Sequence, residues 1–297
     1  NKNNLTVVNN PQFNLNMLKN KKDTGLSALL CLRNAIFAGD VLKYALPWCD
    51  EIIVLYNGTR ENTLDILLEM KNKLNTDKIK IYHYTPTIIP VGANEWGNYD
   101  SNSINSFTNL RNYSIGLASY YDVFKLDGDE LFIPSILKKA YQLYREGKRV
   151  RFKGINIHYR NNKFYISKHI PTCEYRYYPS RHNINKYPCN RNAYEGCSWP
   201  QDTKKREMIT LSPGFYHLHW LQPLYGSINY DFKTNTRSRY KKLYRKVLNW
   251  YDDESNWVDA DTFIKKRWTD IKEMPSEMIK TPHWLKSDTI NKVKKLL

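Results

Sequence analysis

The sequence predicts an α/β fold with a mixed, mainly parallel β-sheet that carries helices on both faces. Three observations predict it. Short, continuously apolar segments alternate with amphipathic segments of helical period over the first half of the chain. The connections between them are short, and strands that alternate with helices in this way form parallel sheets. With 41% hydrophobic and 14% aromatic residues among 297, the chain also has enough apolar surface to build at least one sizeable core.

The elements of the first half follow in regular order. A strand is expected over residues 26–32, because this run is short and apolar throughout, as in a buried strand of a parallel sheet. Asn57-Gly58 is a strong turn signal and ends a later strand. The expected elements after residue 32 are a helix over 38–47, a strand over 51–56, a helix over 61–74, a strand over 79–84, a long polar loop over 85–106, a helix over 107–119 and a strand over 123–126.

The two ends of the chain differ from this pattern. Residues 1–25 are rich in Asn and Lys and are interpreted as an N-terminal arm. Beyond residue 147 the chain becomes β-rich and heavy in Tyr and Arg, and from about residue 235 it reads as helical. We therefore expect an arm over 1–25, a main domain over 26–225 and a basic helical C-terminal extension over 226–297.

The charge is strongly positive. There are 46 Lys and Arg residues against 29 Asp and Glu, a formal net charge of +17. Such a charge attracts nucleic acid, anionic lipid head groups or diphosphate-bearing small molecules, without choosing among them. The excess is spread along the chain, which argues against a nucleic-acid-binding tail. No apolar stretch approaches the roughly 20 residues of a membrane-spanning helix, so none is expected.

Acidic residues gather after the strand expected over 123–126. Asp127 and Asp129 are separated only by Gly128, and Glu130 follows. Two carboxylates so close raise each other's pKa unless a cation neutralises them. Hard divalent cations with oxygen ligands, Mg²⁺ or Mn²⁺, are the natural occupants and are usually shared with substrate phosphates. The alternative, an ordinary acidic turn at a strand end, stays open on these residues alone.

The segments LSALLCLRN, EIIVLYNGTRENTLDIL and LRNYSIGLASYYDVFKLDGDE, which begin at Leu26, Glu51 and Leu110, extend the pattern. Their order and spacing resemble those of GT-A glycosyltransferases, most of all family 2 and its relatives. The resemblance covers residues 26–134 and fades towards residue 221. It implies a GT-A-like catalytic domain over 26–225, with a nucleotide-sugar half over 26–134 and an acceptor half over 135–225.

The resemblance also implies roles for single residues. Asp127, Gly128 and Asp129 match the DxD motif, in which a metal bridges protein carboxylate and nucleotide diphosphate; Asp129 is the first candidate for direct ligation. Asn57 stands where the family usually has a carboxylate that holds the base or ribose. The other residues expected around the donor are Leu32, Arg33, Asn34 and Arg111.

Further candidates come from the second half. Many GT-A enzymes supply a late histidine to the metal, and His217 and His219 would share one face of an extended strand. A buried structural histidine is the alternative. An inverting transferase needs a general base, most often Asp or Glu, to take the acceptor's proton. Asp202 is the first candidate, followed by Glu195 and Glu174.

Together these expectations describe a metal-dependent glycosyltransferase that moves a hexose or pentose to a hydroxyl of a glycan acceptor. The donor is expected to be a nucleotide-sugar, on family grounds a UDP-sugar, the cofactor Mn²⁺ or Mg²⁺, and the stereochemistry inverting. Two alternatives remain: a nucleotidyltransferase acting on sugar phosphates, and a basic nucleic-acid-binding module. The first is weakened because no Gly-rich, Lys-bearing phosphate loop follows the first strand, and the second leaves the acidic motif unexplained.

The sequence also bears on the cellular compartment. Five cysteines are an odd number, which favours a reducing environment. Of three N-glycosylation sequons, those at Asn57 and Asn112 fall where the resemblance places the nucleotide. We therefore expect cytoplasmic synthesis of bacterial or viral type, with peripheral membrane contact through the basic C-terminal helices as a second option. Because the sequence begins at Asn1 rather than Met, an upstream anchor or further domain stays open.

Overall fold

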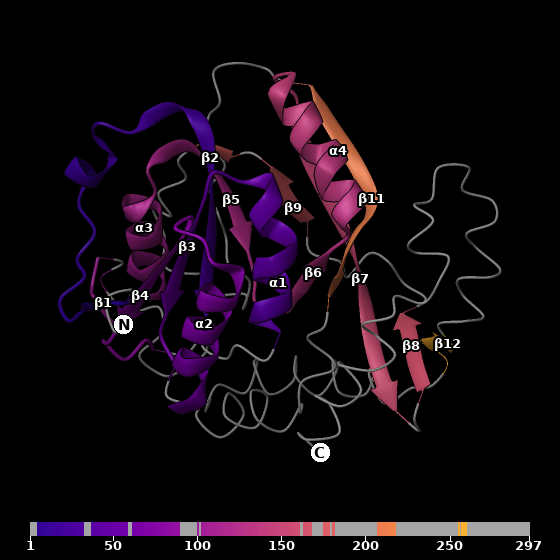
Figure 1. The fold of residues 1–297 in the computed structure, drawn as a ribbon, viewed down its shortest axis with the longest axis horizontal. Helices are drawn as coiled ribbons and strands as arrows, with labels where there is room; N and C mark the ends of the chain where they lie inside the picture. Colours follow the sequence, from indigo (N-terminus) through magenta and orange to yellow (C-terminus); the bar gives the residue numbers. More distant parts are fainter. Residues whose placement is uncertain are drawn as a thin grey trace.

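The computed structural model describes residues 5–32, 37–58, 61–89, 100, 102–160, 163–167, 175–178, 180–181, 207–217, 255 and 257–259. Within these residues, six strands form a first sheet (Figure 1). Neighbouring strands are parallel, except that β10 runs antiparallel to β5. The strand order is β1 (Leu5–Val8), β4 (Ile79–Tyr84), β3 (Glu51–Tyr56), β2 (Lys22–Leu32), β5 (Tyr120–Leu126) and β10 (Ser180–Arg181).

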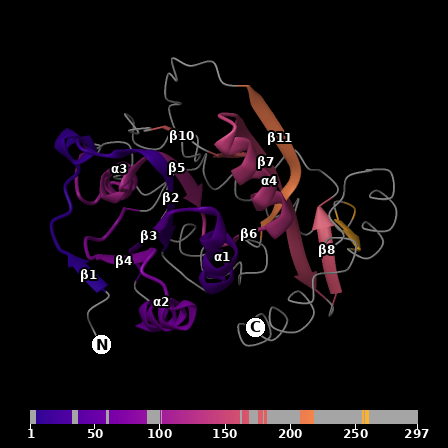
Figure 2. The ribbon, with the colours of Figure 1, turned by 45° about the horizontal axis from the view of Figure 1, so that its top comes forward.

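Helices cover both faces of this sheet (Figures 1 and 2). On one face lie α1 (Ala38–Ala45), which runs on into the short helix η2 (Leu46–Trp48), and α2 (Glu61–Leu74). The helix α4 (Pro134–Arg145) shares the same core but packs mainly on two strands of a second sheet, β7 (Arg149–Arg160) and β11 (Met208–His217). On the other face of the first sheet lie α3 (Phe107–Leu117) and the short helix η1 (Leu15–Leu18). Helices on both faces favour apolar residues in the central strands, and all six residues of β3 are buried, with Glu51 as the one charged residue among them.

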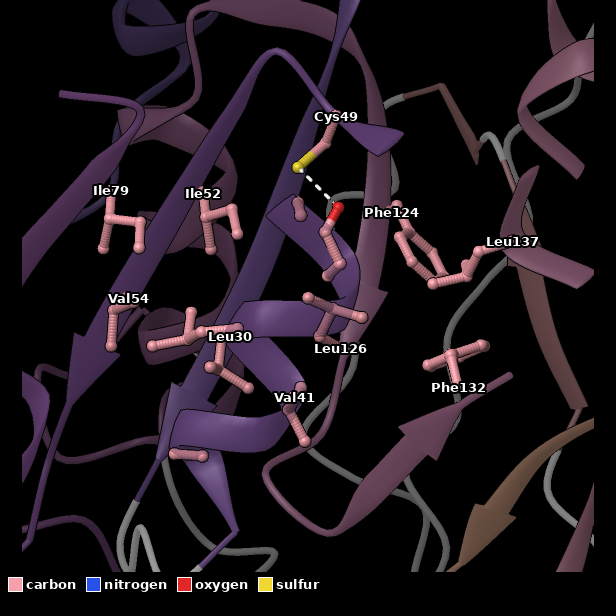
Figure 3. Close-up of a cluster of buried hydrophobic side chains, with 14 of the residues drawn as sticks. Leu30, Val41, Cys49, Ile52, Val54, Ile79, Phe124, Leu126, Phe132 and Leu137 are labelled. Atoms are coloured by element: carbon pink, nitrogen blue, oxygen red, sulfur yellow. Dashed lines mark hydrogen bonds between the residues drawn. The ribbon is translucent and has the colours of Figure 1, made fainter. Parts of the chain in front are cut away.

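Alternate residues of the central strands face two different cores. Leu30 of β2 and Val54 of β3 pack with Val41 of α1 in the larger core (Figure 3). Leu29 and Ile53, one position earlier on the same strands, pack instead with residues of α3. This period of two is what a pleated strand imposes on side chains. The face of any residue at a strand end can therefore be read from its position in the alternation.

A second sheet follows the first along the chain. Its pairing is antiparallel except between β7 and β11, which run parallel. The aromatic rings of Phe132 on β6 and Phe215 on β11 lie 5.0 Å apart and join its inner face to the larger core. Within the described residues the strand order is β12 (Trp257–Asp259), β8 (Lys163–Ser167), β7 (Arg149–Arg160), β11 (Met208–His217) and β6 (Glu130–Phe132), with β9 (Tyr175–Tyr178) also paired to β7.

The predicted fold class is confirmed: the first sheet is mainly parallel and carries helices on both faces. Three elements, β3, α2 and β4, have the predicted bounds. The strand predicted to begin at Leu26 begins instead at Lys22, because Gly25 adopts a φ of +130° and the pairing with β5 continues across a register shift. The helices predicted over 38–47 and 107–119 end at Ala45 and Leu117.

Both ends of the chain contribute strands. In the segment predicted to be an arm, β1 pairs in parallel with β4 at the edge of the first sheet. Trp257–Asp259, where the sequence predicts helix, form a strand that pairs with β8. Trp and Val suit a pleated strand, and the pairing partner lies far away in sequence, so local periodicity could not reveal it. The rest of the C-terminal extension lies outside the described residues. None of the described helices is both long and apolar enough to cross a membrane.

Candidate functional site

The carboxyl ends of β2 and β5 meet where the winding of the first sheet reverses. From β2 the chain winds one way through β3 and β4, and it then crosses back to form β5 on the other side of β2. The two strands are parallel partners, with Leu30 opposite Leu126. In open α/β sheets ligands bind outside the carboxyl ends of the strands at such a switch point. Asp127, Gly128 and Asp129 follow Leu126 directly and therefore lie where a ligand is expected.

A tight turn carries this acidic segment into the second sheet. The N–H of Glu130 donates a hydrogen bond to the carbonyl oxygen of Asp127 at 3.2 Å, and Glu130 then begins β6. Glu130 is fully buried, whereas the side chains of Asp127 and Asp129 are 26% and 17% exposed. Because both carboxylates are largely shielded from water, a nearby cation interacts with them more strongly than it would at an open surface.

Strand β11 brings a histidine to this segment. In the antiparallel pairing of β6 with β11, His217 lies opposite Glu130. Its Nε2 atom is 3.9 Å from Oδ2 of Asp129, and its side chain is 16% exposed. Of the two histidines considered from the sequence, His217 thus lies beside the acidic motif, and His219 is outside the described residues.

Asp129 and His217 are close enough to share one cation, since two metal–ligand bonds of about 2.1 Å span up to about 4 Å between the ligand atoms. In the described part of the chain, no three His, Cys, Asp or Glu side chains form a group that could hold a metal ion. Mg²⁺ and its analogues, however, usually take only one or two carboxylates from the protein and complete their shell with water and substrate phosphates. The residues present fit a shared site of that kind.

Two cations lie on the α3 side of the same strand ends. Lys125 Nζ is 3.1 Å from Oδ2 of Asp127. Arg111 of α3 is 7% exposed, and its guanidinium carbon lies 4.7 Å from the centre of the Phe107 ring, which fixes its orientation. Burial raises the pKa of the Cys31 thiol, while the charges of Arg111 and Lys125 lower it and that of Asp127 raises it further. The charges of all three groups therefore act on Cys31, near the end of β2.

Asn57, at the end of β3, has a structural task for its amide. Its Nδ2 atom donates hydrogen bonds to the carbonyl oxygens of Tyr84 at 2.8 Å and Pro86 at 2.7 Å. Its backbone N–H donates to the carbonyl of Leu32 at 2.7 Å. A carboxylate could not donate to two carbonyls, which gives a physical reason for Asn at a position where the resembled family usually has an acid.

The remaining predicted site residues are placed less directly. The Leu32 side chain is 3% exposed and belongs to the larger core, so only its backbone is available to the crevice. Asn57 and Asn112, the asparagines of two sequons, are both buried in the folded protein. The residues outside the described part of the chain are Arg33, Asn34, Glu174, Glu195, Asp202 and His219.

Lys125, whose ammonium group lies beside the acidic motif, was not identified from the sequence. The signal was present in the strand alternation. Lys125 is the second-last residue of β5 and Asp127 directly follows the strand, so the two are one alternation period apart, and side chains two positions apart on a strand share a face. Applying that rule to the residues before the motif would have paired them.

Two solved structures of S. aureus TarS, residues 1–349, are similar to this chain. The structure in complex with UDP-GlcNAc is 20% identical over 46% of this chain and 36% of that chain, with a TM-score of 0.33. The other TarS structure is 16% identical over 91% of this chain and 81% of that chain, with a TM-score of 0.37. Neither likeness is close enough to establish a family or an activity. No protein-family model and no curated protein matches the sequence.

Proposed function

We propose that this chain is a metal-dependent glycosyltransferase that uses a nucleotide-sugar, most simply a UDP-sugar, and transfers the sugar to a hydroxyl of a glycan with inversion. The observation that carries the proposal is the meeting of Asp129 with His217, 3.9 Å apart, beside the D-G-D segment at the switch point of the sheet. A carboxylate from the turn after β5 and an imidazole from β11 of the second sheet converge there, where a nucleotide is expected.

Each group at the strand ends has a task in this proposal. Asp129 and His217 would hold Mn²⁺ or Mg²⁺, which when bound neutralises charge on the departing diphosphate. Arg111, held over Phe107, supplies a second positive charge on the α3 side. Asn57 fixes the loop after β4 that borders the end of β3. A carboxylate, for which Asp202, Glu195 and Glu174 are the candidates, would accept the proton of the attacking hydroxyl.

The test begins with ligand-dependent thermal stability. Nucleoside diphosphates and nucleotide-sugars are screened with Mn²⁺ and with EDTA, since a ligand at 100 times its Kd stabilises the folded state by about 2.7 kcal/mol. We expect a shift that requires metal and is largest for a uridine nucleotide. Absence of any shift with folded protein would overturn the proposal.

A variant and a matched control make the screen specific. Asp129→Ala should abolish the metal-dependent shift without loss of fold. Asp77→Ala, at an exposed aspartate in the turn before β4, should retain it. The products decide the reaction class: release of nucleoside diphosphate supports sugar transfer, and release of pyrophosphate would instead indicate nucleotidyl transfer.

A further inference from the structure

The two carboxylates of the acidic motif have different partners. Oδ2 of Asp127 lies 3.1 Å from Nζ of Lys125, and Oδ2 of Asp129 lies 3.9 Å from Nε2 of His217. The first contact is local to the end of β5, whereas the second joins the turn after β5 to β11 of the other sheet. Each carboxylate thus lies near a basic side chain, one from β5 of the first sheet and one from β11 of the second.

The strand alternation fixes the side on which Lys125 lies. Val123, two positions before Lys125, packs with Ile115 of α3. Lys125 belongs to the same alternate series of β5 and so to the α3 side of the sheet. Asp127 directly follows the last residue of β5, and its Oδ2 atom lies 3.1 Å from Nζ of Lys125. Both affect the thiol of Cys31, which contacts residues of α3 in a cluster on that side. The ion pair therefore keeps Asp127 beside Lys125 on that side.

The ion pair between Lys125 and Asp127 has enough shielding to hold this arrangement. The side chains are 29% and 26% exposed, unlike the surface pair of Lys73 with Glu69, whose side chains are 65% and 63% exposed. Exposed pairs contribute little, because water and salt screen them and two long side chains must be ordered. Shielding makes the charge of Lys125 more effective on its neighbour.

We propose that Lys125 is a positioning residue that holds Asp127 on the α3 side of the switch point and leaves Asp129 and His217 for the cation. The inference rests on the proposed function and adds to it a division of labour between the two aspartates. Without the ammonium group, Asp127 is a second carboxylate next to Asp129 and is drawn to the metal. The variant then binds metal more tightly in the absence of nucleotide.

The experiment is a titration with Mn²⁺ alone, followed by the loss of the free-ion EPR signal. Lys125→Met should raise Mn²⁺ affinity by about tenfold, and Lys125→Arg, which keeps the charge, should stay near the wild type. Lys73→Met removes an equally paired but exposed lysine of α2 and serves as the matched control, with unchanged affinity.

A double-mutant cycle separates positioning from simple charge. In the Asp127→Asn background Lys125→Met should give no gain, because the carboxylate that it releases is absent. A gain of the same size in both backgrounds would overturn the inference, as would no gain in the single variant. Lys125→Gln, which also lacks the charge, replaces Lys125→Met if thermal unfolding shows that the methionine variant is not folded.

The readout keeps this inference apart from the proposed function. Mn²⁺ binding is measured without nucleotide and without turnover. If the wild type binds no nucleotide, the proposed function fails, while a gain in Lys125→Met that Asp127→Asn cancels still supports the division of the carboxylates. If nucleotides bind and no gain appears, only the role of Lys125 fails.

Discussion

The ring of Phe215 lies directly against the backbone of Gly154. A Cβ atom built at Gly154 would be 2.3 Å from Cε2 of Phe215. The ring is fully buried and stacks near Phe132, so it has little room to turn away. Gly154 on β7 therefore allows β11 to approach closely. Strand β11 ends at His217, two residues after Phe215.

Gly154→Ala should consequently destabilise the fold by about 1–3 kcal/mol, as overpacked cores do. Because β11 must shift, it should also weaken Mn²⁺ binding through His217. Denaturant unfolding and a Mn²⁺ titration measure the two effects. Gly147→Ala is the control. The added Cβ atom would have no neighbour within 4 Å, and alanine would be strained only by the φ of +77°, so metal binding should be unchanged. Wild-type stability in Gly154→Ala would contradict the prediction.

Asn57→Asp should destabilise the protein although it restores the residue type usual in the resembled family. The change would place a buried carboxylate against the carbonyl oxygens of Tyr84 and Pro86 in place of two hydrogen bonds. Leaving such groups unsatisfied costs about 1–3 kcal/mol, and more when a charge is involved. Denaturant unfolding gives the value. Asn105→Asp, which loses one exposed hydrogen bond to Thr87, should cost less. An equal cost at both sites would refute the buried role of Asn57.

β2 and β3 were predictable because residues 26–32 and 51–56 are short, largely apolar runs that are almost entirely buried. β1 was not, since Leu5–Val8 is a four-residue edge strand with its middle residues exposed and its pairing partner, β4, far away in sequence. The second sheet was predictable only as β-rich sequence. Its parallel pairing of β7 with β11 depends on contacts across a long stretch of chain, which local patterns do not encode.

The candidate site divides in the same way. The position of Asp127 and Asp129 at a strand end followed from the apolar run before them. The sequence offered His217 and His219 equally, and only the register of β11 against β6 places His217 beside Asp129. The partners of Asn57 depend on the path of the loop after β4, so its hydrogen bonds to two backbone carbonyls could not be predicted from the sequence, and its contact with a ligand stays a prediction.

His217→Ala should weaken Mn²⁺ binding by about tenfold or more, equivalent to about 1.4 kcal/mol. The imidazole comes from the second sheet and its Nε2 atom lies 3.9 Å from Oδ2 of Asp129, so its loss leaves the proposed cation with fewer protein ligands. Mn²⁺ titration of the purified variant measures the change. His83→Ala removes a histidine of β4 that packs against Tyr56 of β3, and should leave the affinity unchanged. Equal affinities in wild type and His217→Ala would exclude this histidine from the metal site.

Glu51, at the amino end of β3, makes the free energy of unfolding depend on pH in the acid range. Burial alone would raise the pKa of its carboxyl, but hydrogen bonds from Lys80, from the backbone N–H of Ser119 and from Ser27 outweigh burial and lower it. A group whose pKa is lower in the folded state stabilises the fold above its unfolded value, 4.5 here, and loses that contribution as the pH falls through the folded value.

Glu51→Gln should therefore cost about 1.5–3 kcal/mol at neutral pH, the range for hydrogen bonds to a charged group. Its unfolding free energy should fall less steeply than that of the wild type below pH 4.5, so the two curves converge in acid. Urea unfolding at a series of pH values gives both curves. Glu69→Gln, at an exposed carboxylate paired with Lys73, should follow the wild type throughout. Parallel curves for wild type and Glu51→Gln would show that the buried network does not carry the acid dependence.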